Sequence, residues 1–402
     1  MPDTDPEGLR TAAERVLRSN WRSGRRADGI PYGFTCPAPR KYVHQWYWDS
    51  CFHAIAWRAI DPERAREELR TLVRAMTPDG LVPHTIFWAG RARWRRAPLY
   101  ATATRFGSLA TAHTQTPVLA LAWELVANGD AEFAREGVEP LARHYDWLDR
   151  ERDPDGDGLI AILFPDESGL DDSPKYDQVY GWLAHWSPGY FWLVERHRRH
   201  GYSAKAIVER FDHHLEDVLV NVFYALSLRA LHRMSGLERF RERAERVEAA
   251  LMERCWDERG GLFFDIAERS ERRVEVSTWS ALAPLALGGL PEEVRRRLVE
   301  EHLLDPRRYS APVGIPSVSM DEPSFRAGFD GFRCWRGPSW VNTAWLLVPP
   351  LRELGYPAAA ERIVGSLRGA VAREGFREYY NPLTGKGHGA RDFGWSTLLV
   401  DL

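Results

Sequence analysis

The 402-residue sequence has few of the features that mark disulfide-linked, zinc-binding or membrane-spanning proteins. Its four cysteines are scattered and form no CxxC pair, so no zinc spacing occurs and buried, reduced thiols are expected. No apolar run approaches the ~20 residues that a membrane span needs, and the N-terminal stretch lacks the apolar centre of a signal peptide. These absences predict a cytoplasmic protein.

A strong charge of either sign is also missing. Lys and Arg number 54 against 57 Asp and Glu, for a formal net charge of -3. Because a nucleic-acid-binding domain is normally strongly basic, this balance argues against such a partner. Lysine occurs only at Lys41, Lys175, Lys205 and Lys386, which we interpret as a compositional bias toward arginine. The expected partner is a small molecule, and the protein is expected to be a monomer or a small homo-oligomer.

The helical period dominates the chain. Amphipathic helices with Arg and Glu on the polar face are predicted over 6–21, 62–76, 237–256, 292–304 and 357–374. Helices buried on most sides are predicted over 50–60, 117–127, 218–231, 277–288 and 339–351. The two sets roughly alternate, which predicts an all-α toroid with an outer ring of helices around an inner ring. No linker interrupts residues 1–402, so one domain is expected, with short hairpins at LIAILF (159–164) and GLFFDI (261–266).

Motifs for metal-dependent chemistry are incomplete. The stretch DPDGDG (153–158) resembles the start of an EF-hand calcium loop. The twelfth position of such a loop requires a bidentate Glu, and here it is Phe164. We interpret the stretch as a turn and leave a calcium site of another kind open. The isoprenoid-cyclase motif DDxxD fails because Lys175 replaces its last acid, and HExxH, P-loop and GxSxG motifs do not occur.

Two acidic segments remain as candidates for chemistry. DESGLDDSPKYD (166–177) holds five carboxylates in twelve residues. The second segment, 376–402, carries Glu378 before two tyrosines and a Gly-rich loop, a composition that suits a mobile lid over a pocket. Aromatic residues, including 17 Trp in the chain, are available to stack on sugars. Two carboxyl groups in such surroundings suit glycoside hydrolysis, in which one protonates the leaving oxygen and the other activates water or attacks the sugar.

Several ordered stretches resemble glycoside hydrolase family 63, which is related to trehalases and glucoamylases. They are QWYWDSCFHAIA (45–56), DGLVPH (79–84), TQTPVLALA (114–122), DESGLDDSP (166–174), EDVLVN (216–221), CWRGPSWVNTAWLL (334–347) and the EYYNPLTGKG and FGWS pieces of 378–396. The resemblance implies an (α/α)6 barrel with short β-hairpins in its loops, forming a single catalytic domain over 1–402. Its compact form is similar to the bacterial mannosylglycerate and glucosylglycerate hydrolases, which cleave an α-linked hexose from D-glycerate.

The resemblance also implies the catalytic pair. The ESGxD motif of the family supplies the general acid, which falls on Asp171 in this sequence. The Glu of its EYY motif is the base that activates water, and it falls on Glu378. The family is similar to inverting enzymes, whose two carboxyl groups stand roughly 6.5–9.5 Å apart. From the residues alone, Asp172 competes equally with Asp171 for the acid role.

A substrate-binding wall is implied in the same way. Trp48 would stack on the sugar, and Asp49 would hold two of its hydroxyl groups. The other expected wall residues are Tyr42, Trp46, Gln115, Trp335, Arg336, Gly337, Tyr379 and Tyr380. Trp340 and Trp345 are interpreted as inner-helix core, and Tyr380 departs from the Trp expected in closer relatives.

A glycerate carboxylate would require a cation. The candidates are Arg336, Lys175, Lys386 and Arg391. No cofactor and no catalytic metal are implied, because an acid and a base suffice for the reaction. Two alternatives stay open: an α-glucosidase or trehalase-like enzyme acting on neutral disaccharides, and a catalytically inactive carbohydrate-binding protein on the same fold.

Overall fold

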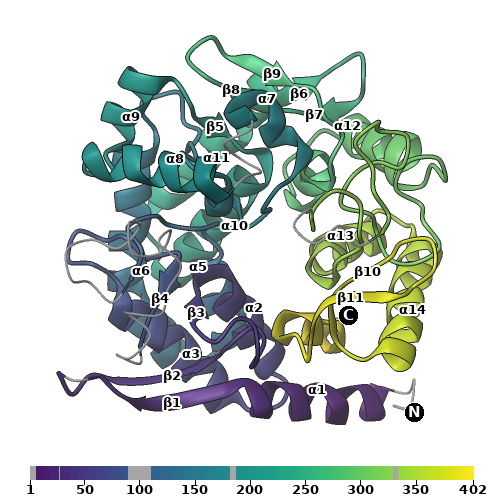
Figure 1. Ribbon diagram of the computed structural model, residues 1–402, viewed down its shortest axis with the longest axis horizontal. Helices are drawn as coiled ribbons and strands as arrows, with labels where there is room; N and C mark the ends of the chain where they lie inside the picture. Colours follow the sequence, from purple (N-terminus) through teal and green to yellow (C-terminus); the bar gives the residue numbers. More distant parts are fainter. Residues whose placement is uncertain (1–5, 27, 89–109, 182–186, 329–333) are drawn as a thin grey trace.

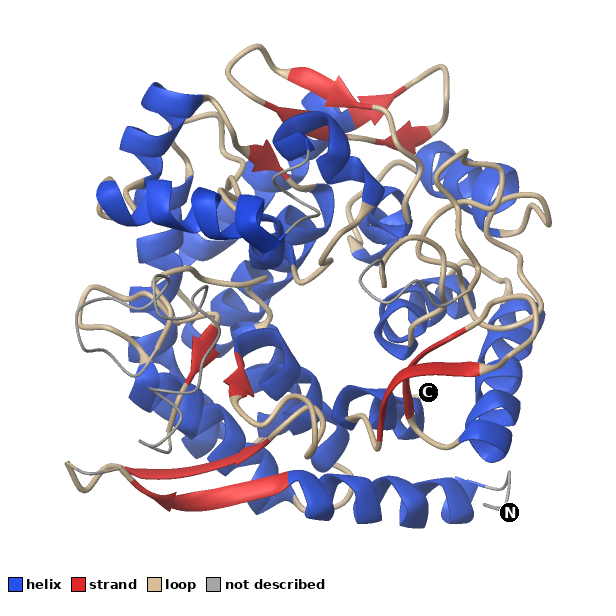
Figure 2. Ribbon diagram, viewed as in Figure 1, coloured by secondary structure: helices blue, strands red, loops and turns tan. Residues whose placement is uncertain are grey.

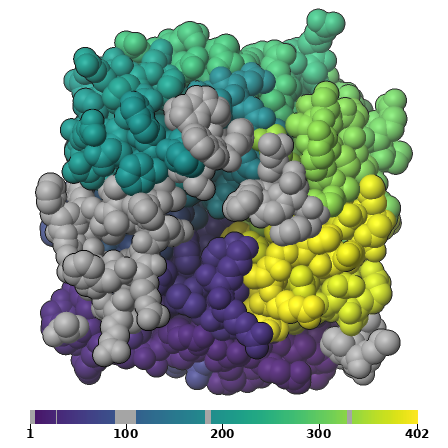
Figure 3. All heavy atoms as spheres, viewed as in Figure 1, coloured from purple at the N-terminus to yellow at the C-terminus, as the bar shows by residue number. Residues whose placement is uncertain are grey.

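The computed structural model describes residues 6–26, 28–88, 110–181, 187–328 and 334–402. The helices are arranged as a ring, and the strands are short and lie between them (Figures 1 and 2). Helix α1 (Pro6–Asn20) packs against the last helical segment, η8 (Gly394–Asp401). The two ends of the chain therefore meet, and their atoms lie side by side on the face shown in Figure 3.

The inner ring consists of the segments with the most apolar sequences. They are α2 (Tyr47–Trp57), α5 (Leu119–Ala127), α10 (Val218–Ser235), the 3-10 segment η6 (Trp279–Ala286), α13 (Val341–Glu353) and η8. Each contacts the next, and η8 packs back onto α2, which closes the ring. Every residue of α2 is buried. An inner helix has protein on all sides, which explains why these segments carry so few charges.

Each inner segment packs against an outer helix that adjoins it in the sequence. The outer helices are α1, α3 (Pro62–Ala75), α6 (Ala131–Arg152), α11 (Glu238–Ala250), α12 (Glu292–Arg297) with the π-helical turn η7 (Leu298–Leu303), and α14 (Pro357–Glu374). Helix α3 begins with Pro62 in its first turn, and the Asp61 side chain accepts a hydrogen bond from the Arg64 N–H. The alternation of outer and inner helices confirms the predicted (α/α)6 toroid.

The loops contain additional short helices and strands. The helical ones are η2 (Pro165–Ser168), η3 (Pro174–Tyr176), α7 (Asp177–Tyr180), α8 (Ser187–Arg199), α9 (Ala204–Phe211) and η5 (Leu251–Cys255). The short strands are β3 (Gln45–Trp46), β4 (Thr85–Ile86), β5 (Leu215–Glu216), β6 (Trp256–Asp257), β7 (Leu262–Phe263), β8 (Asp265–Ala267) and β9 (Arg272–Val274). GLFFDI thus contributes to two strands, whereas LIAILF makes a single bridge, from Ile162 to Leu215.

Two hairpins were not foreseen from the sequence. One joins β1 (Trp21–Arg25) to β2 (Pro31–Thr35), and the other joins β10 (Arg377–Tyr380) to β11 (Gly387–Arg391). The second is the segment expected to be a Gly-rich lid. Its turn is fixed by the Asn381 side chain, whose Oδ1 accepts hydrogen bonds from the Leu383 and Thr384 N–H groups. Glu378 therefore stands on a paired strand.

Within the part of the chain that the structure describes, the main hydrophobic core runs from Leu9 to Leu399, and a smaller cluster of Leu163, Ala204, Ile207 and Val208 lies apart from it. Among the described residues, none of the helices has both the length and the apolar surface to cross a membrane. The four cysteines are free, and Cys36, Cys51 and Cys255 are buried as expected. Cys334 is only half-buried, which corrects the expectation for that thiol.

A buried ion network fixes the start of helix α10. Lys175 Nζ lies 2.6 Å from Asp217 Oδ2 and 3.2 Å from Asp265 Oδ2. Asp217 caps α10, because its Oδ1 accepts from the N–H groups of the first turn, and Asp265 Oδ1 accepts from the Val218 N–H. Although burial opposes the charged form, these two carboxylates raise the pKa of Lys175. The ammonium therefore links the acidic segment 166–177 to an inner helix.

Replacing Lys175 with Met should destabilise the protein by about 3–5 kcal/mol, because two buried carboxylates would lose their cation. Urea unfolding followed by circular dichroism measures the change. The matched control is Arg70→Met, which breaks the more exposed Arg70–Glu136 pair and should cost less than ~1 kcal/mol. Equal losses in the two variants would contradict the structural role of Lys175.

Candidate functional site

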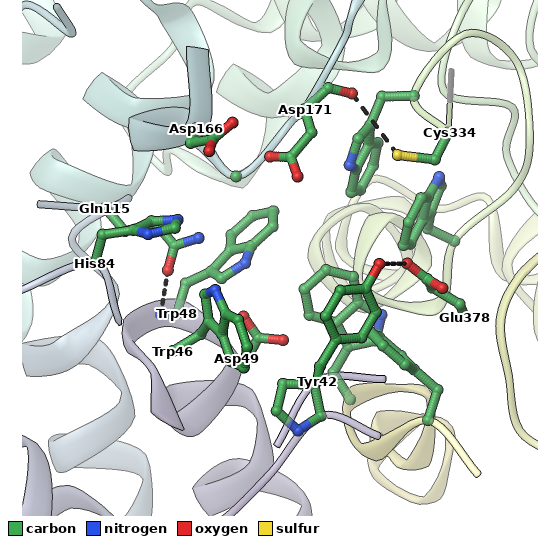
Figure 4. Close-up of a pocket in the computed structure, with 16 residues that line it drawn as sticks. Tyr42, Trp46, Trp48, Asp49, His84, Gln115, Asp166, Asp171, Cys334 and Glu378 are labelled. Atoms are coloured by element: carbon green, nitrogen blue, oxygen red, sulfur yellow. Dashed lines mark hydrogen bonds between the residues drawn. The ribbon is translucent and has the colours of Figure 1, made fainter. Parts of the chain in front are cut away.

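A pocket of about 590 Å³ lies at the end of the ring where the inner helices begin. Trp48 and Asp49 belong to the first turn of α2, Gln115 precedes α5, and Trp340 immediately precedes α13. The complete lining is Pro37, Tyr42, Trp46, Trp48, Asp49, His84, Gln115, Asp166, Gly169, Asp171, Cys334, Trp335, Trp340, Glu378, Phe393 and Trp395 (Figure 4).

Tryptophans form much of the pocket wall. The rings of Trp335 and Trp340 are stacked, with centroids 3.9 Å apart. Trp395 lies 5.5 Å from Trp340 and 5.1 Å from Trp48 between ring centroids. Trp340, which was expected to be core, therefore contributes to the wall, whereas Trp345 is buried away from it. Aromatic faces of this kind can contact the apolar face of a sugar ring.

Trp48 is positioned by two close contacts. Its backbone N–H, which has no partner within the first turn of α2, donates to Gln115 Oε1 at 3.0 Å. Its indole lies against Gly169, where a Cβ atom would be 2.4 Å from the ring. Gly169 also has a φ of +74°, so glycine is required there on both grounds. The acidic segment 166–177 is thus in direct contact with Trp48.

Asp49 and His84 supply polar groups beside Trp48. Asp49 is buried, and burial, followed by repulsion from Asp171, raises its pKa well above the ordinary value. His84 Nδ1 lies 2.8 Å from Thr85 Oγ1, and burial lowers the pKa of the imidazole to about 4. At neutral pH the His84 ring is therefore uncharged. In the sequence, His84 stood out only as the end of the DGLVPH stretch.

Asp171 and Asp166 form a carboxyl pair on one wall. Solvent in the pocket reaches Asp171, but the carboxyl group is surrounded by protein, and this burial raises its pKa to about 7. A side-chain hydrogen bond with Asp166 acts in the opposite direction, and the charges of Glu378 and Asp172 raise the value further. The pKa of Asp166 is also raised, by burial and then by Asp171. The pair can thus retain a proton at neutral pH.

Glu378 lies on a different wall, on strand β10 (Figure 4). The Tyr42 hydroxyl donates to its Oε1 at 3.0 Å. The Ala390 N–H donates to Oε2 at 2.6 Å, and Lys41 Nζ lies 3.3 Å from the same oxygen. Burial and the Glu378 charge raise the pKa of Tyr42, so its phenol remains a donor. These three donors hold both oxygens of the Glu378 carboxyl group in place.

Asp171 and Asp172 are adjacent in the sequence but have different surroundings in the structure. Asp171 lines the pocket, whereas Asp172 adopts a φ of +60° and its Oδ1 lies 3.6 Å from Arg336 Nη2. Glu167 is also directed elsewhere: the Arg152 guanidinium donates to both of its oxygens, at 2.6 and 2.7 Å. These acids therefore hold the segment in place around Asp171.

Four of the expected wall residues are not in the lining. Arg336 donates to both oxygens of Asp177, at 2.5 and 2.9 Å. Gly337, with a φ of +151°, passes so close to the Arg326 backbone that a Cβ atom would be 2.4 Å from its carbonyl oxygen. Tyr379 packs behind Trp340, with ring centroids 4.8 Å apart. These three residues support the lining from outside.

Tyr380 is the fourth. It is fully buried, and its hydroxyl donates to the Gly375 carbonyl oxygen at 2.7 Å. A register shift in the hairpin between Arg377 and Tyr379 breaks the simple alternation of strand faces. Tyr380 therefore packs at the base of the hairpin. The position where Tyr replaces the expected Trp lies outside the pocket.

The cations named as carboxylate partners also lie outside the lining. Lys175 belongs to the buried network below α10, while Lys386 and Arg391 are exposed on the second hairpin. A cation that does lie near the pocket is Lys41, which the sequence did not single out. Its ammonium contacts Glu378 and lies 4.5 Å from the centroid of the Tyr42 ring. Only the folded hairpin brings these residues together, so no local motif marks Lys41.

Known proteins resemble this chain over nearly its whole length. The family model described as mannosylglycerate hydrolase MGH1-like glycoside hydrolase domain matches residues 42–396. A mannosylglycerate hydrolase of Thermus thermophilus is 31% identical over 405 residues, spanning 91% of this chain and 95% of the relative. A glucosylglycerate hydrolase of Mycolicibacterium hassiacum is 28% identical and spans 99% and 98% of the two chains.

Solved structures agree with this similarity. A crystal structure of a family 63 mannosylglycerate hydrolase of Thermus thermophilus in complex with Tris has a TM-score of 0.84 at 30% identity, covering 98% of this chain and 99% of that one. The same enzyme has been solved with Tris and D-glycerate and with glucose. Neutral trehalase of Saccharomyces cerevisiae, at 16% identity and a TM-score of 0.61 over 97% and 78% of the chains, shares the fold.

Replacing Asp166 with Ala should raise the pKa of Asp171 above about 7, because the hydrogen bond that stabilises the ionised Asp171 is lost. Carbon-13 NMR of labelled aspartate carboxyl groups measures this pKa, and the Asp171→Asn variant identifies the signal. Asp166→Asn keeps an N–H donor and should change the pKa less. A lower or unchanged value in the Ala variant would contradict the assigned interaction.

Proposed function

The chain belongs to the mannosylglycerate hydrolase MGH1-like glycoside hydrolase family, and from that membership we propose that it is an inverting α-glycosidase acting on mannosylglycerate or glucosylglycerate. The observation that carries the proposal is the pair of unlike carboxyl groups on different walls of one aromatic pocket. Asp171 can retain a proton near pH 7, while Glu378 accepts hydrogen bonds from three donors. An inverting glycosidase needs one carboxyl group that donates a proton to the leaving oxygen and a second that takes a proton from water.

In this mechanism Asp171 is the general acid. Its proton passes to the glycosidic oxygen as the bond from that oxygen to the anomeric carbon breaks, and the glycerate leaves as an alcohol. The pKa of about 7 leaves a substantial fraction of Asp171 protonated at neutral pH. Asp166, whose pKa is raised by burial and by Asp171, stabilises the Asp171 carboxylate left after the transfer through their hydrogen bond.

Glu378 is the general base. It takes a proton from a water molecule, whose oxygen bonds to the anomeric carbon from the face opposite the leaving group. The Tyr42 hydroxyl and the Ala390 N–H fix the carboxylate orientation, because each donates to a different oxygen. The α-glycoside therefore yields the β-anomer of the free hexose.

The sugar would bind against the first turn of α2. Trp48 offers an indole face, and Asp49, Gln115 and His84 offer polar groups around it. The neutral His84 ring can hydrogen-bond a hydroxyl without adding charge. Trp46, whose ring edge packs on Tyr42 at 5.7 Å between centroids, would contact the sugar from the side of the base. The stacked Trp335 and Trp340 complete the apolar surface.

Lys41 would orient the base, because its ammonium contacts Glu378 on the face opposite the leaving glycerate. The Lys41 side chain is about half exposed and lies at the Glu378 wall, while the Arg336 guanidinium is engaged by Asp177 and Asp172. The D-glycerate and glucose complexes are known for the Thermus thermophilus relative, whose family this chain shares. We place the whole activity in one domain over residues 1–402, supported by the main hydrophobic core.

Asp171→Asn and Glu378→Gln should each lower kcat by ~10²–10⁴-fold, because each removes one proton-transfer group, while folding is retained. Steady-state assays with mannosylglycerate and glucosylglycerate measure the loss. Asp172→Asn is the matched control, since this neighbouring acid contacts Arg336 and not the pocket, and its kcat should stay within about tenfold of wild type. Full activity of either catalytic variant would refute the assignment.

Hydrolysis of a hexosyl-glycerate should exceed that of trehalose, and proton NMR during the reaction should detect the β-hexose before mutarotation. The reason is the similarity of the chain to mannosylglycerate and glucosylglycerate hydrolases over nearly its whole length. Faster hydrolysis of trehalose would favour a trehalase-like enzyme. The α-hexose as first product would refute inversion, and tight binding without any product would indicate a carbohydrate-binding protein.

A further inference from the structure

Helix α3 carries an acid on the face that it turns toward the inner ring. Glu68 lies on the same apolar stripe as Ala65, Leu69 and Leu72, and its exposed fraction is 0%. A carboxyl group is costly at such a position unless its oxygens are hydrogen-bonded. The partners of these two oxygens therefore indicate what the acid does in the interior of the barrel.

Both oxygens of Glu68 accept hydrogen bonds from segments that lead into the sugar pocket. Ser50 Oγ donates to Oε1 at 2.7 Å, and the Thr35 N–H donates to Oε2 at 2.7 Å. Ser50 follows Asp49 in the first turn of α2, and Thr35 ends strand β2. The chain continues from Thr35 directly to Pro37, which lines the pocket as Asp49 does. One side chain of the outer ring thus holds two separate stretches of the pocket wall.

The bond from Ser50 is the end of a chain of hydrogen bonds whose direction is fixed. Trp88 Nε1 donates to Gln45 Oε1 at 2.6 Å, and Gln45 Nε2 donates to Ser50 Oγ at 3.1 Å. An indole N–H can only donate, so the Gln45 oxygen faces Trp88 and its NH₂ group faces Ser50. The Ser50 hydroxyl hydrogen is then left for Glu68. Because Gln45 immediately precedes the lining residue Trp46 on β3, the chain holds a third part of the wall.

A neighbouring histidine connects the same acid to the last helical segment of the ring. His53 Nδ1, on α2, lies 3.8 Å from Glu68 Oε1, and neither ring nitrogen has a hydrogen-bond partner among the described residues. The ring packs so closely on Gly394 that a Cβ atom there would be 2.2 Å from His53 Nε2. Gly394 stands between the lining residues Phe393 and Trp395. The surroundings of Glu68 thus extend behind this side of the pocket as well.

We propose that Glu68 is a positioning residue for the sugar-binding wall, an inference that rests on the proposed function. It does not line the pocket. Through Ser50 it sets the place of Asp49, and through Ser50 and Gln45 it sets the place of Trp46. Two acceptor oxygens are needed together, since each donor would otherwise be left unpaired in the interior. Glutamine has a single oxygen, so at this position it would turn its NH₂ group toward one of the two donors.

A second residue of α3 distinguishes positioning from simple stabilisation. Thr71, one turn beyond Glu68, is also fully buried, and its Oγ1 accepts from the Gly33 N–H at 3.0 Å. Like Glu68 it joins α3 to strand β2, but Gly33 lies within the strand, away from the lining residues. Thr71→Val removes this acceptor and keeps the shape of the side chain. It is therefore the matched control for the loss of a buried acceptor.

The test compares steady-state kinetics of full-length variants with mannosylglycerate and glucosylglycerate. Glu68→Gln should lower kcat/KM by roughly 10–100-fold, because a shift of the wall by about 1 Å misplaces the sugar. Most of the loss should fall on KM, since the acid and the base lie on other segments. Ser50→Ala should cause a similar loss, and the double variant should lose little more, because both changes break one chain. Thr71→Val should keep kcat/KM within about threefold of wild type.

Hydrogen–deuterium exchange measured by mass spectrometry supplies a readout that needs no substrate. Peptides covering residues 45–50 should exchange roughly tenfold faster in Glu68→Gln than in wild type, and at the wild-type rate in Thr71→Val. Unchanged exchange of this segment would overturn the proposal, as would equal losses of kcat/KM in the two variants. If Glu68→Gln does not fold, Ser50→Ala, which keeps the bond from Thr35, carries the same expectations. A wild-type chain that hydrolyses neither glycoside would contradict the proposed function, and the exchange comparison would still decide the role of Glu68.

Discussion

The inner helices begin at the pocket, and each beginning leaves backbone N–H groups without partners inside the helix. These groups must find acceptors, and the ones they find are side chains that also shape the site. Gln115 accepts from the first turn of α2, and Asp217 and Asp265 accept from the first turn of α10. The need to satisfy the helix ends thus gathers buried polar residues at the place where a polar ligand can be bound.

At this end of the ring, two carboxyl groups lie in different surroundings. Asp171 is surrounded by protein and interacts with another acid, so its neutral form is favoured. Glu378 stands on a strand whose neighbour presents an N–H, and Tyr42 and Lys41 approach it from the N-terminal part of the chain. The proton affinity of Asp171 is decided here by burial and by neighbouring acids, which are properties of the tertiary structure and not of residue type.

The sequence predicts five of the six outer helices from the 3.6-residue period and five of the six inner segments from their apolar composition, but α6 and η8 were not predicted. It also predicts, through the resemblance of local motifs, that Asp171 and Glu378 belong together, and both line one pocket. Lys41 could not be found in this way, because it acts through a partner distant in sequence. Tyr380 was placed in the wall because it follows the base closely, but the register shift in the hairpin directs it to the base of the turn. Sequence identifies which segments meet, and the folded strands decide which of their side chains reach the ligand.

Glycines opposite Trp48 and Glu378 set a further limit on how this pocket can change. A Cβ at Gly169 would meet the Trp48 indole at 2.4 Å, and one at Gly389 would meet Glu378 Oε2 at 2.5 Å. Both positions also have positive φ, so no other residue fits them without strain. A larger residue at either position therefore requires a second replacement at the side chain it would meet, so a change of substrate range in this pocket is made with less strain at its mouth.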